Sequence, residues 1–367
     1  MTVETTPAPV ASILERTLAG ERLSEADAVR LWHEADLEAL GRAADAVRAR
    51  LHPEGLVTYV IDRNVNYTNV CNAYCSFCSF YRPKGHAEGY VLTHEQLFQK
   101  IAELKAVGGT EVLMQGGIHP DLTIEFYEEM LRAIKARFDI HLHAFSPPEI
   151  DWIAKASKLS LHETLVRLKA AGLDSIPGGG GEILVDRVRD SISRLKLKSE
   201  PWLEVHRQAH RIGLRSTATM MYGTVETPEE VMAHLGKVRA LQDETGGFTA
   251  FIAWNFQGEG TPLMKARGSK LRRLPADHYL RTVAIARLFL DNVANLQASY
   301  VTQGKATAGR SLHFGVNDMG GTMMEENVVS AAGTFYLMPI EELLDVVRAE
   351  GFRPAQRNTF YQILRIH

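Results

Sequence analysis

The sequence is poor in cysteine, with three in 367 residues, and it lacks both a long apolar run and an excess of positive charge. An odd cysteine count without a signal-peptide pattern argues against disulfides and for a reducing compartment. No apolar run approaches the ~20 residues that a membrane span needs. The net charge of −3 provides no basic field for nucleic acid. We therefore expect a cytoplasmic protein that binds neither membranes nor nucleic acid.

The three cysteines, Cys71, Cys75 and Cys78, all fall within eight positions, with the spacing C-x3-C-x2-C. Three thiolates on one short loop can hold three irons of a 4Fe–4S cluster, which is built on cysteine sulfur. Because there is no fourth cysteine, one iron is left without a protein thiolate. That iron can accept a ligand from outside, which is a condition for chemistry rather than plain electron transfer.

The cysteine spacing by itself also fits three arrangements without an open iron. A structural zinc site with His86 or His94 as its fourth ligand is one, although zinc modules usually carry two C-x2-C pairs. An electron-carrying iron–sulfur protein is another. Three unrelated buried cysteines are a third, but such close spacing in a chain of this length argues against chance.

Strand-like and helix-like segments alternate from about residue 57 onward. Such alternation is typical of a parallel sheet with right-handed crossovers, and eight units predict a (β/α)8 barrel of the TIM type. A doubly wound open sheet is the alternative, because the last two units are weak. The predicted strands are 65–70, 111–114, 140–145, 173–176, 214–220, 248–254, 296–300 and 311–314.

The predicted organisation has three parts. Residues 1–56 form an N-terminal helical extension with a disordered start at 1–10, residues 57–335 form the barrel, and residues 336–367 form a helix and an extended tail packed on it. Thr93 with Gln96, and Thr227 with Glu230, are the capping boxes of two barrel helices. A further helix is expected at 325–332.

The segments that follow the strands carry polar residues, and in a TIM barrel these ends form the active site. Gln115, Gly116 and Gly117 follow the second strand. His141 and His143 alternate on the third strand and therefore share one face. A glycine run over 178–181 leads to Glu182 and lacks the Lys-Ser/Thr of a phosphate-binding P-loop. We read it as a tight turn that places Glu182 near a ligand.

The cysteine spacing, with Phe77 as the aromatic residue before Cys78, resembles the radical S-adenosylmethionine (SAM) superfamily. This resemblance implies that the cysteines bind a 4Fe–4S cluster whose open iron holds the amino and carboxylate groups of SAM. One-electron reduction then releases a 5′-deoxyadenosyl radical. It also implies cofactor contacts from five residues: Phe77, Gln115, Gly116, Gly117 and Glu182.

Four longer segments, 59–71, 175–189, 216–227 and 317–333, resemble the cyclic dehypoxanthinyl futalosine synthase family of the futalosine route to menaquinone. The resemblance implies hydrogen abstraction from the sugar 4′ carbon of dehypoxanthine futalosine and ring closure onto its benzoate. The sister aminofutalosine and deazaflavin-forming synthases share the cysteine loop. They usually carry a histidine where this chain has Thr224, which favours the cyclase.

The implied reaction needs a base for its last proton, and His143, Glu182 and Glu226 are the candidates. It also needs an electron donor, for which we expect a flavodoxin, a ferredoxin or another reductase. Expected substrate contacts come from the polar and aromatic residues near the strand ends: His141, Tyr222, Trp254, Gln257, Asn317, Asp318, Thr322 and Glu325.

Overall fold

The computed structural model describes residues 9–367 except 269, 270, 272, 273, 326, 329, 334, 335 and 337. Its α-helices are α1 (Val10–Leu18), α2 (Glu25–Glu34), α3 (Leu37–Leu51), α4 (His94–Ala106), α5 (Ile124–Arg137), α6 (Pro147–Ser157), α7 (Leu161–Ala171), α8 (Asp186–Ile192), α9 (Ser199–Arg211), α10 (Pro228–Thr245), α11 (Pro262–Arg267), α12 (Ala276–Phe289), α13 (Tyr300–Gln303), α14 (Lys305–Ser311) and α15 (Ile340–Ala349). Its strands are β1 (Leu56–Val60), β2 (Asp62–Val65), β3 (Glu111–Met114), β4 (His141–Ala144), β5 (Ser175–Ile176), β6 (Arg215–Tyr222), β7 (Phe248–Asn255), β8 (Asn295–Gln297), β9 (Asp318–Gly321), β10 (Arg353–Arg357) and β11 (Ile363–Ile366).

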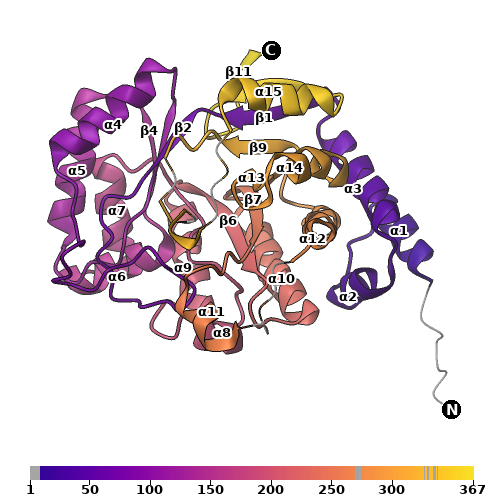
Figure 1. Ribbon diagram of the computed structural model, residues 1–367, viewed down its shortest axis with the longest axis horizontal. Coiled ribbons are helices and arrows are strands. Elements are labelled where there is room, and N and C mark those ends of the chain that lie inside the picture. The colour runs from indigo at the N-terminus through magenta and orange to yellow at the C-terminus, as the bar shows by residue number, and fades with distance from the viewer. Residues whose placement is uncertain are drawn as a thin grey trace.

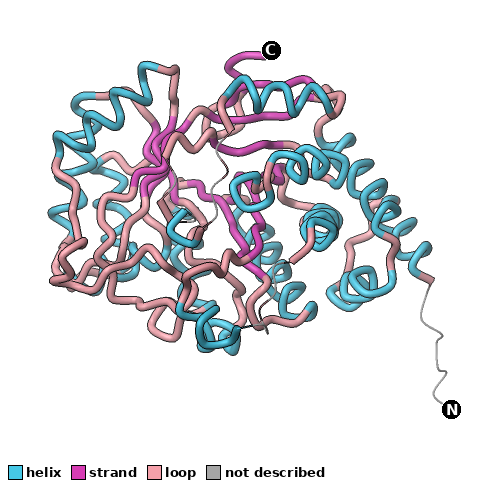
Figure 2. Tube along the Cα trace, in the orientation of Figure 1, coloured by secondary structure: helices cyan, strands magenta, loops and turns pink. Residues whose placement is uncertain are grey.

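All eleven strands belong to one curled sheet, in the order β11-β10-β1-β9-β8-β7-β6-β5-β4-β3-β2. Every neighbouring pair is parallel except β10 with β11. Most of the helices that connect β2 through β9 lie on the outside of the curled sheet (Figures 1 and 2), whereas the short α13 contributes to the lining of its interior. This arrangement confirms the predicted TIM-type barrel.

One bent stretch of chain joins the two sides of the barrel. β1 pairs with β9, whereas β2 pairs with β3, and only Ile61 lies between β1 and β2. The Thr322 amide donates to the carbonyl of Val60 at 3.0 Å, and the Thr110 amide donates to that of Ile61 at 3.0 Å. Residues 56–65 therefore run from beside β9 to beside β3. They close the barrel wall without a continuous ladder of strand hydrogen bonds.

The N-terminal helices α1, α2 and α3 pack against the barrel beside α12 (Figure 1). Gly41 of α3 permits close packing, because a Cβ at this position would lie 2.7 Å from the ring of Phe314. Arg22 anchors the same end through ion pairs with Asp243 at 2.7 Å and Asp291 at 2.8 Å. Among the described residues, no helix has the length and apolar character needed to cross a membrane.

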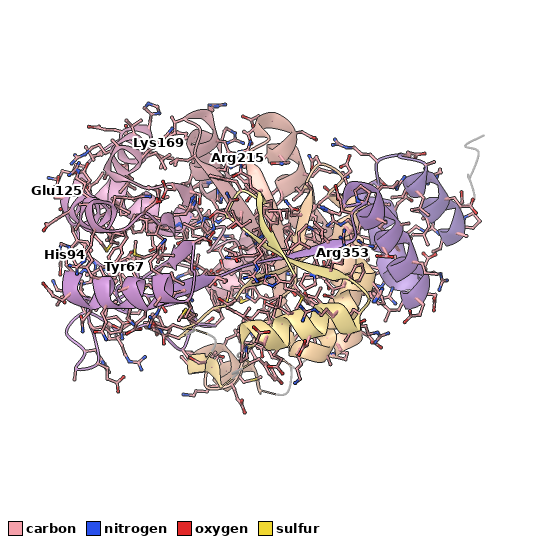
Figure 3. All side chains as sticks on the ribbon, turned by 90° about the horizontal axis from the view of Figure 1, so that it is seen from above. Tyr67, His94, Glu125, Lys169, Arg215 and Arg353 are labelled. Atoms are coloured by element: carbon pink, nitrogen blue, oxygen red, sulfur yellow. The ribbon has the colours of Figure 1, made fainter. Side chains whose placement is uncertain are left out.

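The C-terminal tail covers the end of the barrel where the strands begin. Its strand β10, labelled at Arg353 in Figure 3, lies alongside β1. Arg357 then forms a buried ion pair with Asp318 of β9, with Nε–Oδ2 at 2.5 Å. Thr359 donates a hydrogen bond to the Glu111 carboxylate of β3 at 2.5 Å. The tail thus contributes to the barrel floor, and the proposed division at residues 56 and 335 stays a prediction.

The predicted capping boxes at Thr93 and Thr227 are both present. The predicted strand 65–70 is wrong in extent, because β2 ends at Val65. Beyond it the chain pairs with a neighbouring loop instead of the sheet: Thr68 donates to the carbonyl of Tyr90 at 2.6 Å, and Asn69 donates to that of Glu88 at 2.9 Å.

The predicted eighth strand at 311–314 is also wrong. This segment ends α14 and continues as a 3₁₀ turn, Leu312–Phe314, which stops at Gly315 with φ of 93°. The eighth barrel strand is β9, whose two glycines hid the alternating pattern that predicts a strand. The predicted disordered start, 1–10, lies largely outside the described residues. The predicted helix 325–332 lies partly outside them, and a 3₁₀ turn spans Ser330–Ala332.

Candidate active site

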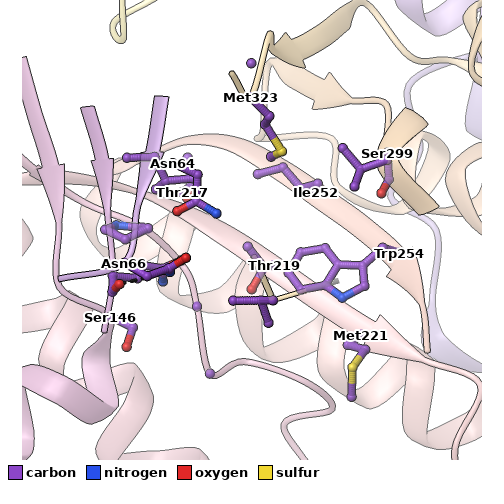
Figure 4. Close-up of a pocket in the computed structure, with 18 of the residues that line it drawn as sticks. Asn64, Asn66, Ser146, Thr217, Thr219, Met221, Ile252, Trp254, Ser299 and Met323 are labelled. Carbon is purple, nitrogen blue, oxygen red and sulfur yellow. Dashed lines mark hydrogen bonds between the residues drawn. The ribbon is translucent and has the colours of Figure 1, made fainter. Parts of the chain in front are cut away.

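A cavity of about 410 Å³ occupies the barrel interior and reaches the cysteine loop. Its lining includes all three cysteines at one end and Arg357, Thr359 and Tyr361 of the tail at the other. Side chains from strands on all sides of the barrel point into it (Figure 4). The cavity lies where a TIM barrel places its active site, and it extends down to the floor.

The cysteine loop is held on several sides by hydrogen bonds. The Cys71 amide donates to the carbonyl of Arg82 at 3.0 Å, which closes the loop on itself. Ser76 donates through its amide to Ile192 of α8 at 2.9 Å, and its own carbonyl accepts from Leu263 of α11 at 2.7 Å. The loop is therefore fixed to two helices that lie more than a hundred residues further along the chain.

The environment of the thiols combines burial with a nearby cation. Cys75 is buried, and Cys71 and Cys78 are partly exposed. Burial raises the pKa of Cys75 to about 12, while the Lys196 ammonium acts in the opposite direction. The Ala73 amide points at the Cys71 sulfur from 3.4 Å. Such cations and amide donors stabilise thiolate ligands.

The glycines that follow β3 allow the strand end to pack against this loop. A Cβ on Gly117 would lie 2.2 Å from the carbonyl oxygen of Val70, directly before the first cysteine. A Cβ on Gly116 would lie 2.5 Å from the ring of Tyr67. The buried Glu149 carboxylate accepts from the Gly116 amide at 2.9 Å and from the Tyr67 hydroxyl at 2.7 Å. Glycine is thus required here by close approach to the chain itself, while the expected contact with the cofactor stays a prediction.

Glu182 lies beside the cysteine loop within a buried charged group. Its backbone has φ of 35°, a left-handed conformation that is unusual for a non-glycine residue and is often found at functional sites. Its carboxylate accepts from Lys196 Nζ at 2.8 Å and lies 3.5 Å from Arg189 Nη1. Lys196 Nζ also lies 5.3 Å from the centre of the Phe77 ring. Two cations and one carboxylate leave a positive charge near the thiols.

The cavity has two chemically distinct walls (Figure 4). The polar wall is formed by side chains from β2, β3 and β4 and the segments after them: Asp62, Asn64, Asn66, Gln115, His143 and Ser146. The opposite wall, called the apolar wall below, is largely apolar, although Thr217 and Thr219 of β6 also line it. Its apolar side chains come from β6, β7, β9 and the segments after them: Met221, Ile252, Trp254, Phe256, Met319 and Met323. A ligand with a sugar and an aromatic ring would find partners on opposite sides.

His143 is the predicted candidate base that lies on the cavity surface in a neutral form. It is 6% exposed, and burial together with Arg357 lowers its pKa to about 3. The candidate Glu226 is placed elsewhere. Its carboxylate accepts from the amides of Thr224 and Val225, both at 3.0 Å, and so stabilises the turn after β6. It does not line the cavity.

Of the predicted substrate contacts, Trp254 and Gln257 line the cavity, and three others are used in packing. His141 lies off the cavity with its ring against Phe360. Tyr222 faces outward and stacks on His278, with 5.5 Å between ring centres. The Asn317 side chain accepts from Arg287 at 2.8 Å inside the wall.

The remaining three predicted contacts join parts of the chain to each other. Asp318 pairs with Arg357, and Thr322 Oγ lies 3.3 Å from the Asp62 amide, where it helps close the barrel. Glu325 forms ion pairs with Lys100 at 2.6 Å and Arg63 at 2.9 Å. None of the three lines the cavity.

Sequence reasoning missed several residues that do line the cavity. Asp62 and Asn64 alternate on β2, a pattern of inward-facing polar residues that the sequence displays but that lies just before the predicted strand 65–70. Lys196 and Arg357 carry no local motif. Their place in the site depends on long-range contacts, which periodicity does not reveal.

The residues at the cavity mouth fit a 4Fe–4S cluster. Three thiols from one loop face the same cavity, with amide donors and a cation beside them. Each of the three cysteines would bind a different iron of such a cluster, so the sulfurs surround the cluster and do not meet at one ion. In the described part of the chain, no three His, Cys, Asp or Glu side chains converge as ligands of a single metal ion.

A TIM-type barrel with three cysteines on the loop after β2 defines a radical SAM enzyme. Residues 65–238 match the radical SAM superfamily, and residues 245–367 match the CofH/MqnC C-terminal region. The chain is 50% identical to the cyclic dehypoxanthine futalosine synthase of Halalkalibacterium halodurans, covering 96% of this chain and 94% of the relative. It is 44% identical to the protein of that name from Streptomyces coelicolor, covering 99% and 91%.

The chain therefore belongs to the radical SAM superfamily, within the family that carries the CofH/MqnC C-terminal region. The aminodeoxyfutalosine synthase of Thermus thermophilus is 38% identical, covering 96% of this chain and 95% of the relative. Among solved structures, methylornithine synthase superposes with a TM-score of 0.71 at 18% identity, covering 94% and 97%. This likeness supports the fold alone. Enzymes of this superfamily use a 4Fe–4S cluster and SAM.

Proposed function

We propose that this enzyme is the cyclase that converts dehypoxanthine futalosine to cyclic dehypoxanthinyl futalosine in menaquinone biosynthesis. The observation that carries the proposal is the 50% identity, over nearly the whole chain, to a relative named cyclic dehypoxanthine futalosine synthase. Relatives with other activities match less closely, at 38–40% identity. The cavity supports the proposal, because its two walls suit a molecule with a sugar and an aryl group.

The cofactors are assigned to the cavity mouth. Cys71, Cys75 and Cys78 would hold the 4Fe–4S cluster, and the backbone of 115–117 with Phe77 and Glu182 would contact SAM. When bound, the cluster and SAM would together supply a 5′-deoxyadenosyl radical. Lys196 and Arg189 add positive charge beside Glu182, which suits the carboxylate of SAM. We expect a small electron carrier such as flavodoxin or ferredoxin to reduce the cluster.

The chain's own residues would position the substrate and exclude water. Asp62 and Asn64 on the polar wall offer hydrogen bonds to the sugar hydroxyls, and Trp254 on the apolar wall offers a face for the benzoate ring. Ring closure depends on near-attack geometry, so positioning contributes more than acid strength. His143 is the base we assign for the final proton. Glu182 is held by two cations, and Glu226 accepts from backbone amides, so neither is suited to that role.

A choice among substrates tests the proposal. The protein, reconstituted anaerobically with iron and sulfide, is incubated with SAM, dithionite and either dehypoxanthine futalosine or the enolpyruvyl-benzoate substrate of the sister synthase. We expect the cyclic product and 5′-deoxyadenosine only from dehypoxanthine futalosine. Turnover of the enolpyruvyl substrate alone would assign the chain to the aminofutalosine synthases. A third arm with tyrosine and 5-amino-6-(D-ribitylamino)uracil tests the activity named for the 39–40% identical relatives.

A further inference from the structure

A single serine hydroxyl connects the cavity histidine to a second histidine nearer the surface. Ser175 Oγ lies 2.6 Å from His143 Nδ1 and 2.7 Å from His141 Nε2. His141 and His143 share one face of β4, and β4 pairs with β5 so that His143 lies opposite Ser175. Two adjacent strands therefore hold the three side chains in a row.

The buried Ser175 hydroxyl has one proton to donate and can also accept, so a relay requires its two hydrogen bonds to run in the same direction. It donates to one imidazole nitrogen and accepts an N–H from the other. One ring must then face Ser175 with a protonated nitrogen and the other with an unprotonated one, and because His143 uses Nδ1 and His141 uses Nε2, both rings are then the same tautomer. When a proton enters the row at one end and another leaves at the other end, both hydrogen bonds to Ser175 reverse their direction. This transfer of one proton per step is a proton relay.

The two ends of the row lie in different environments. His143 lines the cavity at 6% exposure, and Arg357 faces it. His141 is partly exposed against Phe360, and Glu111, Asp174 and Lys135 are the charged groups that face it. Burial lowers the pKa of His143 to about 3 and that of His141 to about 4, so both rings are neutral at physiological pH and each has one nitrogen without a proton.

We propose that His143, Ser175 and His141 form a relay that carries the final proton of the cyclisation out of the cavity. This inference rests on the proposed cyclase function. The ring adduct loses its C–H proton to His143 Nε2, and the C–H electron pair restores the aromatic ring. One electron leaves to a one-electron acceptor, the oxidised iron–sulfur cluster or its electron carrier. His143 Nδ1–H passes to Ser175 Oγ, the serine proton passes to His141 Nε2, and His141 releases its Nδ1 proton to solvent.

An isosteric pair of variants tests the relay. Ser175→Val removes the hydroxyl, whereas Ser175→Thr keeps it in a side chain of the same shape. We expect Ser175→Val to bind dehypoxanthine futalosine within about twofold of the wild type and to form 5′-deoxyadenosine. Cyclic product per 5′-deoxyadenosine should fall at least about tenfold, and Ser175→Thr should restore most of it. Ser175→Ala, smaller than the natural residue, serves if neither larger side chain fits.

The chain provides a matched control in His210, whose Nε2 lies 2.7 Å from Ser216 Oγ outside the cavity. Ser216→Ala loses a similar hydrogen bond and should leave the product ratio unchanged. An unchanged ratio in Ser175→Val would overturn the relay. Parallel loss of binding, 5′-deoxyadenosine and product would also overturn it, because that is the result of a purely structural role.

A measurement on the cofactor-free protein separates the relay from the proposed function. In protein labelled with ¹⁵N-histidine, NMR should show one protonated and one unprotonated nitrogen facing Ser175. Two protonated or two unprotonated nitrogens facing Ser175 would contradict the relay. If the wild type makes no cyclic product while one facing nitrogen is protonated and the other is not, the proposed function has failed and not the histidine–serine geometry.

Discussion

Lys196 is a buried cation beside the cysteine loop, and no local motif marks it. Although burial acts against it, Glu182 and Cys75 raise the pKa of Lys196, so it stays charged. Its Nζ lies 2.8 Å from Glu182 and over the ring of Phe77. A permanent positive charge at this position favours added electrons on a neighbouring cluster and favours an anionic ligand.

We therefore predict that Lys196→Met weakens SAM binding by about tenfold, the effect of losing one charged contact. It should also make the reduction potential of the cluster more negative, by an amount on the order of tens of millivolts. Equilibrium binding and a spectroscopic redox titration measure these effects. Lys198→Met is the control, because Lys198 lies two residues further on and pairs with Asp190 at the surface. Equal behaviour of the two variants would remove Lys196 from the site.

Asp62 is a buried carboxyl on the polar wall, and burial, then Glu111, raises its pKa to about 7. Between pH 4 and 7 the folded protein keeps this proton while the unfolded chain loses it. Stability therefore falls as pH rises through this window and levels off above it. We predict that Asp62→Asn gains about 2–3 kcal/mol relative to the wild type between pH 5 and pH 8. Urea unfolding of the metal-free proteins at both pH values measures this, and a pH-independent difference would contradict it.

Residues whose role is set by nearby sequence could be predicted, and those assembled by the fold could not. The three cysteines lie on one loop, so their spacing alone indicates a cluster, and Gly116 and Gly117 follow a recognisable strand. Ser175 and Lys196 acquire their neighbours only when separate strands and loops meet. Glu226 shows a related difficulty, because a carboxylate near a strand end can accept from its own turn as readily as from a substrate.

At the level of elements, the end of β3 sets the position of the cysteine loop. Gly117→Ala would place a Cβ 2.2 Å from the Val70 carbonyl oxygen and 2.9 Å from Cys71 Cβ, so the backbone must move. We predict a loss of about 1–3 kcal/mol in the free energy of unfolding and reduced iron per chain after reconstitution. Gly246→Ala is the control, because Gly246 has φ of 61° and open space around it. It should cost about 1 kcal/mol and leave the iron content unchanged.

Helices and strands with a clear local sequence pattern were predicted correctly. Those whose limits depend on contacts with distant parts of the chain were not. The capping boxes fixed the helices at Thr93 and Thr227 correctly. The first strand was placed too late, because residues 66–70 pair with a loop that only the folded chain brings near. The glycine-rich β9 was missed, because glycine gives no alternation of apolar and polar side chains. Alternation over the other strands was enough to predict the barrel.

At the scale of the whole molecule, the tail holds the barrel floor beside β1 and β9. β10 adds to β1, and Arg357 pairs with Asp318 of β9 through Nε at 2.5 Å and Nη2 at 2.9 Å. Both side chains are buried. Removing one member of a buried ion pair leaves the other charge without compensation, which typically costs about 3–5 kcal/mol.

We predict that Arg357→Met lowers the free energy of unfolding by about 3–5 kcal/mol, because Asp318 is then buried as an unpaired carboxylate. The double variant Arg357→Met/Asp318→Asn removes that charge and should recover a large part of the loss. Urea unfolding of the metal-free proteins gives all three values. Ile366→Ser, on β11 of the same tail and 51% exposed, is the control and should be nearly neutral. If the double variant is no more stable than Arg357→Met, the tail does not hold the floor through this charge pair.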